Sequence, residues 1–204
     1  MKLSCLALGD SYTIGEGVAE AERWPQQLAR ALRSHGLELD VQTIARTGWS
    51  TDELAQAMAE TALSNGAYHL VTLLVGVNDQ YRRRALAQFA SGFDHLLQRA
   101  IALARHGTRG VMVLTIPDWG MTPYARNESR DAAQVASEID CFNAHIRTVC
   151  AAQQVALVDV TGISRRLGAD TNALVADGLH PSATQYRQWC EQALPEARKI
   201  LEHR

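Results

Sequence analysis

The sequence predicts an α/β fold in which about five parallel strands form one sheet between two layers of helices. Short apolar runs alternate with segments of helical periodicity five times along the chain, and their connections are short. The run at residues 69–75 is almost continuously apolar, as expected for a strand buried on both faces of a parallel sheet. Right-handed crossovers would then place helices on both sides of that sheet.

The expected strands are short and bounded by turn residues. They cover residues 2–8, 38–45, 69–75, 111–116 and 155–158. Polar residues follow the first three of these runs directly. Because the carboxyl ends of parallel strands share one edge of a sheet, we expect these polar residues to gather where open α/β folds bind ligands.

The expected helices cover residues 20–35, 50–63, 85–105, 130–153, 163–167 and 182–202. The first ends at Gly36, where a left-handed cap is favoured. The second has Ser50 as its N-cap and Glu53 as the capping-box partner. The third has an apolar face at helical spacing, made of Leu86, Phe89, Phe93, Leu96, Leu97, Ala100 and Leu103.

The composition is that of an ordinary globular chain. Its 204 residues can form one domain, residues 1–204, and are 47% hydrophobic and 21% charged. The net charge of -2 gives no reason to expect nucleic acid or an anionic membrane as a partner. The cluster Arg82-Arg83-Arg84 is interpreted as a solvated helix start, or less favourably as a patch for an anionic substrate. No cluster of metal-ligating residues is evident, so neither a metal nor a cofactor is expected.

The four cysteines are scattered and form no C-x-x-C pair. Cys141 and Cys150 are nine residues apart on one expected helix, too far for a disulfide. Free thiols and an N-terminal apolar run too short for a signal peptide favour a cytoplasmic protein.

Ser11 follows the first apolar run, and a neutral serine hydroxyl needs a base to act as a nucleophile. Among seven histidines, His180 alone has an aspartate, Asp177, placed so that a carboxylate could reach Nδ1 and leave Nε2 facing Ser11. The other histidines lie at positions typical of surface or packing roles. We predict Ser11, Asp177 and His180 as catalytic residues; the simpler alternative is that Asp177 and His180 only cap the final helix.

Acyl transfer also needs hydrogen-bond donors for the developing oxyanion. Gly48 can offer a backbone N–H, Asn78 a side-chain amide, and Ser11 its own N–H. Taken singly, Gly48 is typical of a turn and Asn78 is typical of a helix cap. Because both follow successive strands, we favour a joint role as oxyanion donors. Asp10 and Asp79 are assigned to hydrogen bonds that hold loops.

Aromatic residues in or beside the same loops are candidates for the substrate pocket. They are Tyr12, Trp49, Tyr81, Trp119 and Tyr124. Such a wall suits a sugar ring or an acyl chain equally well. Asp118 and Trp119 could form a lid or the rim of an acyl site, and the alternative for Trp119 is that it anchors its loop to the core.

Four sequence blocks resemble, in order and spacing, those of the SGNH/GDSL hydrolases. They are Gly9-Asp10-Ser11-Tyr12, Gly48, Gly76-x-Asn78-Asp79 and Asp177-x-x-His180. The resemblance implies a flavodoxin-like α/β/α sandwich and hydrolysis of esters or thioesters through an acyl-serine intermediate. It also implies Ser11 as nucleophile, His180 as base and Asp177 as its orienting group, with Gly48 and Asn78 in the oxyanion hole. Tyr12 departs from the pattern, because many relatives have leucine after the serine.

We therefore expect a serine esterase that hydrolyses small carboxylic esters, with a preference for short acyl chains. An acyltransferase or thioesterase with the same triad remains an alternative, as does a non-catalytic carbohydrate- or ligand-binding module. A flavin or phosphate binder would use the Gly-Asp-Ser-Tyr-Thr turn as an anion cradle, but would leave Asp177 and His180 unexplained. The natural substrate and the oligomeric state are not predicted.

Overall fold

The computed structural model describes residues 3–128 and 130–202; residue 2 of the first expected strand and His203 lie outside them. The strands are β1 (Leu3–Gly9), β2 (Leu39–Ala45), β3 (Leu70–Leu74), β4 (Val111–Leu114) and β5 (Ala156–Val158). They pair in parallel in the order β2-β1-β3-β4-β5, which confirms the predicted five-stranded parallel sheet. The chain order reverses between β1 and β3, so a ligand crevice is expected beyond the carboxyl ends of those two strands.

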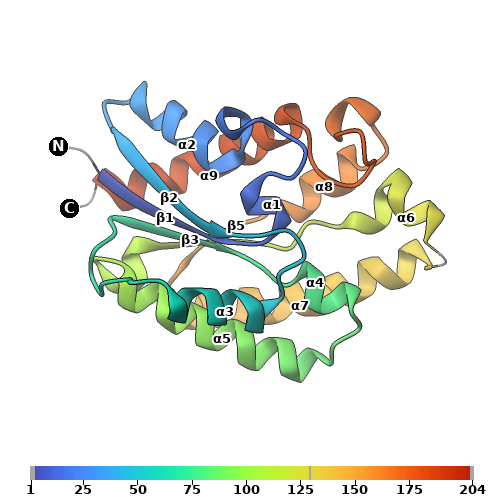
Figure 1. Cartoon of the computed structure of the whole chain (residues 1–204), viewed down its shortest axis with the longest axis horizontal. Coiled ribbons are helices and arrows are strands. Elements are labelled where there is room, and N and C mark those ends of the chain that lie inside the picture. Colours follow the sequence, from blue (N-terminus) through green and yellow to red (C-terminus); the bar gives the residue numbers. More distant parts are fainter. Residues whose placement is uncertain (1–2, 129, 203–204) are drawn as a thin grey trace.

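Helices cover both faces of the sheet (Figure 1). One layer holds α1 (Ser11–Ile14), α2 (Trp24–Arg33), α8 (Thr161–Leu167) and α9 (Ala183–Glu202). The other holds α3 (Thr51–Glu60), α4 (Val77–Tyr81), α5 (Leu86–Leu103) and α7 (Ala132–Gln153). Helix α6 (Pro123–Asn127) and 3₁₀ turns at Glu20–Glu22, Gly107–Gly110, Trp119–Met121 and Thr171–Ala173 lie in the connections.

Two aromatic clusters fill the space between the sheet and its helices. On the α2–α9 side, Tyr186 and Trp189 meet edge to face, with ring centroids 5.2 Å apart. On the other side, Phe89 of α5 stacks on Phe142 of α7 at 4.3 Å. All five residues of β3 are buried. Because both faces are covered, the loops at the strand ends are left to form a binding site.

Several element boundaries differ from the sequence prediction. The helix expected from residue 20 begins at Trp24, because Pro25 suits a first turn and the preceding residues form a 3₁₀ turn. The predicted capping box is confirmed, since Ser50 N donates to Glu53 Oε2 at 2.9 Å, but that helix ends at Glu60. Leu86 was expected on a buried face and is instead 42% exposed at the start of α5.

The interpretation of Arg82-Arg83-Arg84 as a helix start is wrong, although Arg82 and Arg83 are exposed as expected. The three residues follow the end of α4, and Arg83 has a left-handed backbone with φ of 57°. The Arg84 guanidinium pairs with Asp52 at 2.6 Å and lies 3.3 Å from Asp79. Arg82 contacts the loop that carries Gly48, as described below.

All four cysteines are free thiols; Cys5, Cys150 and Cys190 are buried and Cys141 is exposed. In the described part of the chain, no helix is both long enough and apolar enough to span a bilayer.

Candidate active site

Ser11 begins α1 directly after β1, so the strand brings its hydroxyl to the carboxyl edge of the sheet. Asp10 holds this turn, because its Oδ1 accepts the backbone N–H of Tyr12 at 3.0 Å. Gly9 has no room for a side chain, since a Cβ there would lie 2.5 Å from the Leu74 carbonyl oxygen. The Gly-Asp-Ser sequence thus fixes where the hydroxyl lies.

A single loop before α9 holds the predicted base and its carboxylate. Asp177 Oδ1 accepts the backbone N–H groups of Leu179 at 2.8 Å and His180 at 3.0 Å. Gly178 between them has a left-handed φ of 68°, which suits glycine. The turn brings Asp177 Oδ2 to 2.6 Å from His180 Nδ1. The pairing expected from the Asp-x-x-His spacing is therefore present.

The charge of Asp177 suits an orienting role. Burial would raise the pKa of Asp177, but hydrogen bonds from the His180 side chain and from the N–H groups of His180 and Leu179 outweigh burial and lower it. Asp177 is therefore ionised at neutral pH. An anionic acceptor at Nδ1 favours the tautomer with its hydrogen there, which leaves Nε2 able to accept a proton.

Tyr12 supports the imidazole from the interior of the protein. Its ring centroid is 5.6 Å from that of His180 and 6.0 Å from that of Trp189, and the residue is 3% exposed. The residue at which this sequence departs from the leucine of many relatives thus packs directly against the predicted base.

Gly48 and Asn78 come together from the ends of β2 and β3. Gly48 has φ of 86°, a left-handed conformation that favours glycine. Asn78 Nδ2 donates one hydrogen bond to the Trp49 carbonyl at 2.8 Å. An amide nitrogen carries two hydrogens, so this contact orients the group and leaves the second hydrogen for another acceptor.

Asp10 and Asp79 accept backbone N–H groups, as the sequence predicted. Asp79 Oδ2 accepts the N–H of Thr51 at 3.0 Å, and Oδ1 accepts its hydroxyl at 2.8 Å. Burial raises the pKa of both carboxyls, that of Asp10 to about 8. Their contacts hold the loops that carry Ser11 and Gly48.

The predicted catalytic and oxyanion residues line one cavity of about 170 Å³, except Asp177, which lies behind His180. The lining residues are Ser11, Tyr12, Thr47, Gly48, Val77, Asn78, Tyr81, Trp119, Tyr124, Leu179 and His180. Within the described residues, none that lines this cavity is Lys, Arg, Asp or Glu. In the same part of the chain, no hydrogen bond joins Ser11 directly to His180; the two share the cavity wall.

Four of the five predicted aromatic residues line this cavity, and Trp49 does not. Trp49 packs against the core, and its carbonyl holds Asn78. The cavity is also lined by Thr47, Val77 and Leu179, which were not among the predicted pocket residues. Each of them is adjacent in sequence to a predicted site residue, and this adjacency is the only sign in the sequence that it lines the cavity.

Trp119 forms a fixed wall of the cavity. It is 2% exposed, and its Nε1 donates to Gln80 Oε1 at 2.8 Å. Arg130 lies over the ring, 5.6 Å from its centroid. The rings of Tyr81 and Tyr124 flank it at 5.3 and 6.3 Å, and their hydroxyls are 3.3 Å apart.

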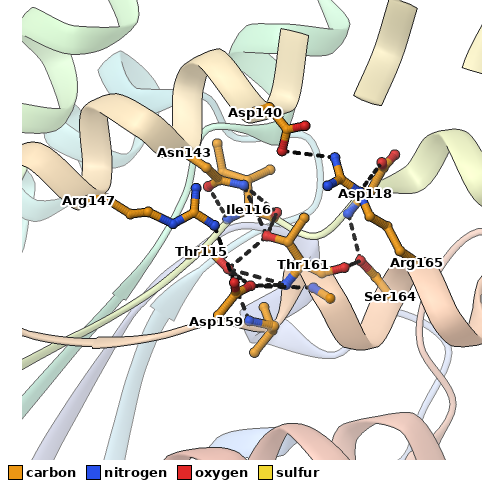
Figure 2. Close-up of polar contacts among 12 residues, drawn as sticks. Thr115, Ile116, Asp118, Asp140, Asn143, Arg147, Asp159, Thr161, Ser164 and Arg165 are labelled. Carbon is orange, nitrogen blue, oxygen red and sulfur yellow. Dashed lines mark hydrogen bonds and ion pairs between the residues drawn. The ribbon is translucent and has the colours of Figure 1, made fainter. Parts of the chain in front are cut away.

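The loop before Trp119 is anchored to α7 and α8 (Figure 2). Asn143 of α7 bonds both the N–H and the carbonyl of Ile116, at 2.8 and 3.0 Å. Asp118 is fully buried, and its Oδ2 accepts a hydrogen bond from Arg165 Nε at 2.9 Å. The backbone N–H of Asp118 donates to Ser164 Oγ at 2.8 Å. Of the two alternatives expected for Asp118 and Trp119, a lid or the rim of an acyl site, these bonds favour the rim, because they tie the loop to α7 and α8 while Trp119 lines the cavity.

Comparison with known proteins shows the family of the chain. The sequence profile of the GDSL-like lipase/acylhydrolase family matches residues 7–188. The chain belongs to this family. A search among curated proteins gives no match.

Solved structures similar to this GDSL-like hydrolase share its fold at low identity. A lipase/acylhydrolase from Enterococcus faecalis is 20% identical, with 97% of this chain and 95% of that chain covered and a TM-score of 0.73. The acetylxylan esterase Axe2 from Geobacillus stearothermophilus is 16% identical, with 96% and 94% covered and the same score. The psychrotrophic esterase EstA from Pseudoalteromonas sp., in a structure inhibited by monoethylphosphonate, is 14% identical, with 98% and 99% covered and a TM-score of 0.71.

Proposed function

We propose that this GDSL-like hydrolase is a serine esterase that cleaves uncharged carboxylic esters with short acyl groups through an acyl-serine intermediate. The observation that carries the proposal is that Ser11, His180, Gly48 and Asn78 line one cavity while Asp177 holds Nδ1 of the imidazole.

In the first step, Ser11 Oγ attacks the ester carbonyl carbon as His180 Nε2 removes the hydroxyl proton. In the part of the chain that the structure describes, the two side chains line the same cavity without a hydrogen bond between them, so this step requires the hydroxyl and the imidazole to approach each other. The imidazolium then gives its proton to the departing alkoxide, which leaves as the alcohol. Water then attacks the acyl-serine as His180 takes its proton, and the imidazolium returns that proton to Ser11 Oγ as the carboxylic acid leaves.

The carbonyl oxygen becomes negatively charged in both steps. The Gly48 N–H, the second hydrogen of Asn78 Nδ2 and the Ser11 N–H would surround it. Each such donor typically contributes about 3 kcal/mol to the transition state. Because the Trp49 carbonyl already orients Asn78, little reorganisation is needed during the reaction.

The cavity supports a small, uncharged substrate. Its volume of about 170 Å³ is below the roughly 300–1,000 Å³ that is typical of pockets for drug-sized ligands. Apart from Thr47 and the catalytic groups, its wall is apolar and aromatic and, among the described residues, carries no Lys, Arg, Asp or Glu, so a charged acyl group would be desolvated without a charged partner. The acetylxylan esterase of similar fold is consistent with acetyl esters as substrates.

We propose a cytoplasmic location, and the free thiols support it. Cell fractionation tests this location, and recovery of the protein outside the reducing compartment would contradict it.

The proposed activity is tested with p-nitrophenyl esters from acetate to palmitate, assayed with wild type, Ser11→Ala and Ser91→Ala. Ser91 is exposed on α5 and serves as the matched control. We expect hydrolysis that is fastest for short chains, is lost in Ser11→Ala and is retained in Ser91→Ala. A preference for long chains would overturn the size argument, and activity in Ser11→Ala would overturn the mechanism. Acyl thioesters, and acceptor alcohols added to the same assay, separate the esterase from a thioesterase or an acyltransferase.

A further inference from the structure

We infer that Arg82 is a positioning residue that fixes Gly48 so that its N–H points into the oxyanion site. This inference rests on the proposed esterase function. Its physical basis is a set of hydrogen bonds from one guanidinium to the loop between β2 and α3.

Arg82 contacts this loop and the first turn of α3 at three points. Its Nη2 donates to the Gly48 carbonyl at 2.7 Å, while Nη1 donates to Ser50 Oγ at 3.0 Å and to Glu53 Oε2 at 2.8 Å. Glu53 Oε2 also accepts the Ser50 N–H that caps α3. The rigid fork of arginine therefore joins Gly48 to the start of a helix.

There is open space where a side chain of Gly48 would lie. A Cβ built on Gly48 would have no atom within 4 Å, and glycine adopts left- and right-handed conformations with similar ease. The residue therefore depends on hydrogen bonds to keep its φ of 86°. The Trp49 N–H donates to the Arg46 carbonyl at 3.2 Å and closes a turn around Thr47 and Gly48. The Arg82 bond to the Gly48 carbonyl adds a side-chain restraint to this turn, and the hydroxyl of Thr47 is held by Glu16.

Arg82 also connects the two proposed oxyanion donors, which are the backbone N–H of Gly48 and the side-chain amide of Asn78. Asn78 is one helical turn before Arg82, and the Arg82 N–H donates to the Asn78 carbonyl at 3.0 Å. The Asn78 side chain donates a hydrogen bond to the Trp49 carbonyl, and the Arg82 side chain donates one to the preceding carbonyl, that of Gly48. Helix α4 and its C-cap therefore set the distance between the Gly48 N–H and the Asn78 amide.

The function of this contact is preorganisation. A donor displaced by about 1 Å can cost up to about 100-fold in rate. Because the oxyanion forms only after attack, loss of the Arg82 contact is expected to lower kcat and to leave KM nearly unchanged.

The test compares Arg82→Gln, Arg82→Lys and the matched control Arg83→Gln. Arg83 is exposed and adjacent in sequence, and it takes no part in the contacts above. We expect kcat to fall about 10- to 100-fold in Arg82→Gln with little change in KM, and to fall less in Arg82→Lys, which keeps the charge without the fork. Arg83→Gln should match the wild type. The inhibition constant of an alkyl boronic acid, which forms a tetrahedral adduct, should rise by the same factor as kcat falls.

A second readout is independent of activity. The heteronuclear ¹H–¹⁵N NOE of the Gly48 amide should decrease in Arg82→Gln and stay at its wild-type value in Arg83→Gln. An unchanged NOE, or a lower melting temperature with unchanged kcat, would overturn the role of Arg82. If the NOE falls but Ser11→Ala retains esterase activity, the esterase proposal fails and the positioning of Gly48 stands.

Discussion

Replacing Asn78 by alanine tests the oxyanion site in a way that separates chemistry from folding. The variant loses the amide hydrogen assigned to the transition state, and we expect kcat to fall about 10²- to 10³-fold, equivalent to about 3 to 4 kcal/mol, with KM nearly unchanged. It also leaves the Trp49 carbonyl without the donor that now lies at 2.8 Å. Loss of that bond should cost about 1 kcal/mol of unfolding free energy. In a protein of this size, the melting temperature should then fall by about 2 to 4 °C.

The assay is initial-rate hydrolysis of p-nitrophenyl acetate, with thermal unfolding measured on the same samples. Asn78→Asp keeps the side-chain volume but presents a carboxylate to the developing oxyanion, so its kcat should fall below that of Asn78→Ala. Asn127→Ala, at the exposed end of α6, is the control and should behave as wild type. Wild-type kcat in Asn78→Ala, together with a lower melting temperature, would refute the reasoning and leave Asn78 as a loop anchor only.

Three further changes test other parts of the site. Asp177→Asn should lower kcat about 10⁴-fold with little effect on KM, because the imidazole loses the acceptor that fixes its tautomer; a loss under tenfold in steady-state assays would contradict this role. Tyr12→Leu should lower the unfolding free energy by about 1 to 3 kcal/mol and reduce kcat severalfold, while Tyr12→Phe keeps the ring against His180 and should retain kcat. Burial raises the pKa of Asp10 in the folded protein to about 8, above its ordinary value of 3.8. Its contribution to the free energy of unfolding is therefore fully present below pH 4 and is lost as pH rises towards 8. Relative to Asp10→Asn, the wild type should lose about 1.4 kcal/mol of unfolding free energy per pH unit between pH 5 and 7, and parallel denaturation curves across that range would contradict it.

The sheet could be predicted from the sequence because its physical signals are local. β3 is buried along its whole length and appears as an uninterrupted apolar run, and Ser50 with Glu53 forms a capping box within four residues. Helix ends were less certain, because they depend on neighbours elsewhere in the chain. The helical spacing showed on which face of α5 Leu86 lies. It did not show that the first turn of α5, which carries Leu86, extends into solvent.

The site was predictable where its contacts are short-range in sequence. Asp177 and His180 are three residues apart, and one turn explains their hydrogen bond. Trp49 was assigned to the pocket because its loop was correctly placed, but loop position does not determine which way a side chain points. Arg82 was hidden for a different reason: its acceptor, the Gly48 carbonyl, is 34 residues away, and a run of three arginines is typical of a solvated surface.

Intact-protein and peptide mass spectrometry after reaction with a fluorophosphonate probe tests most directly whether the cavity activates the Ser11 hydroxyl. We expect a single covalent adduct on Ser11, formed in wild type and in Ser91→Ala and lost in Ser11→Ala. An unmodified wild-type protein, or an adduct on any other residue, would contradict activation of Ser11.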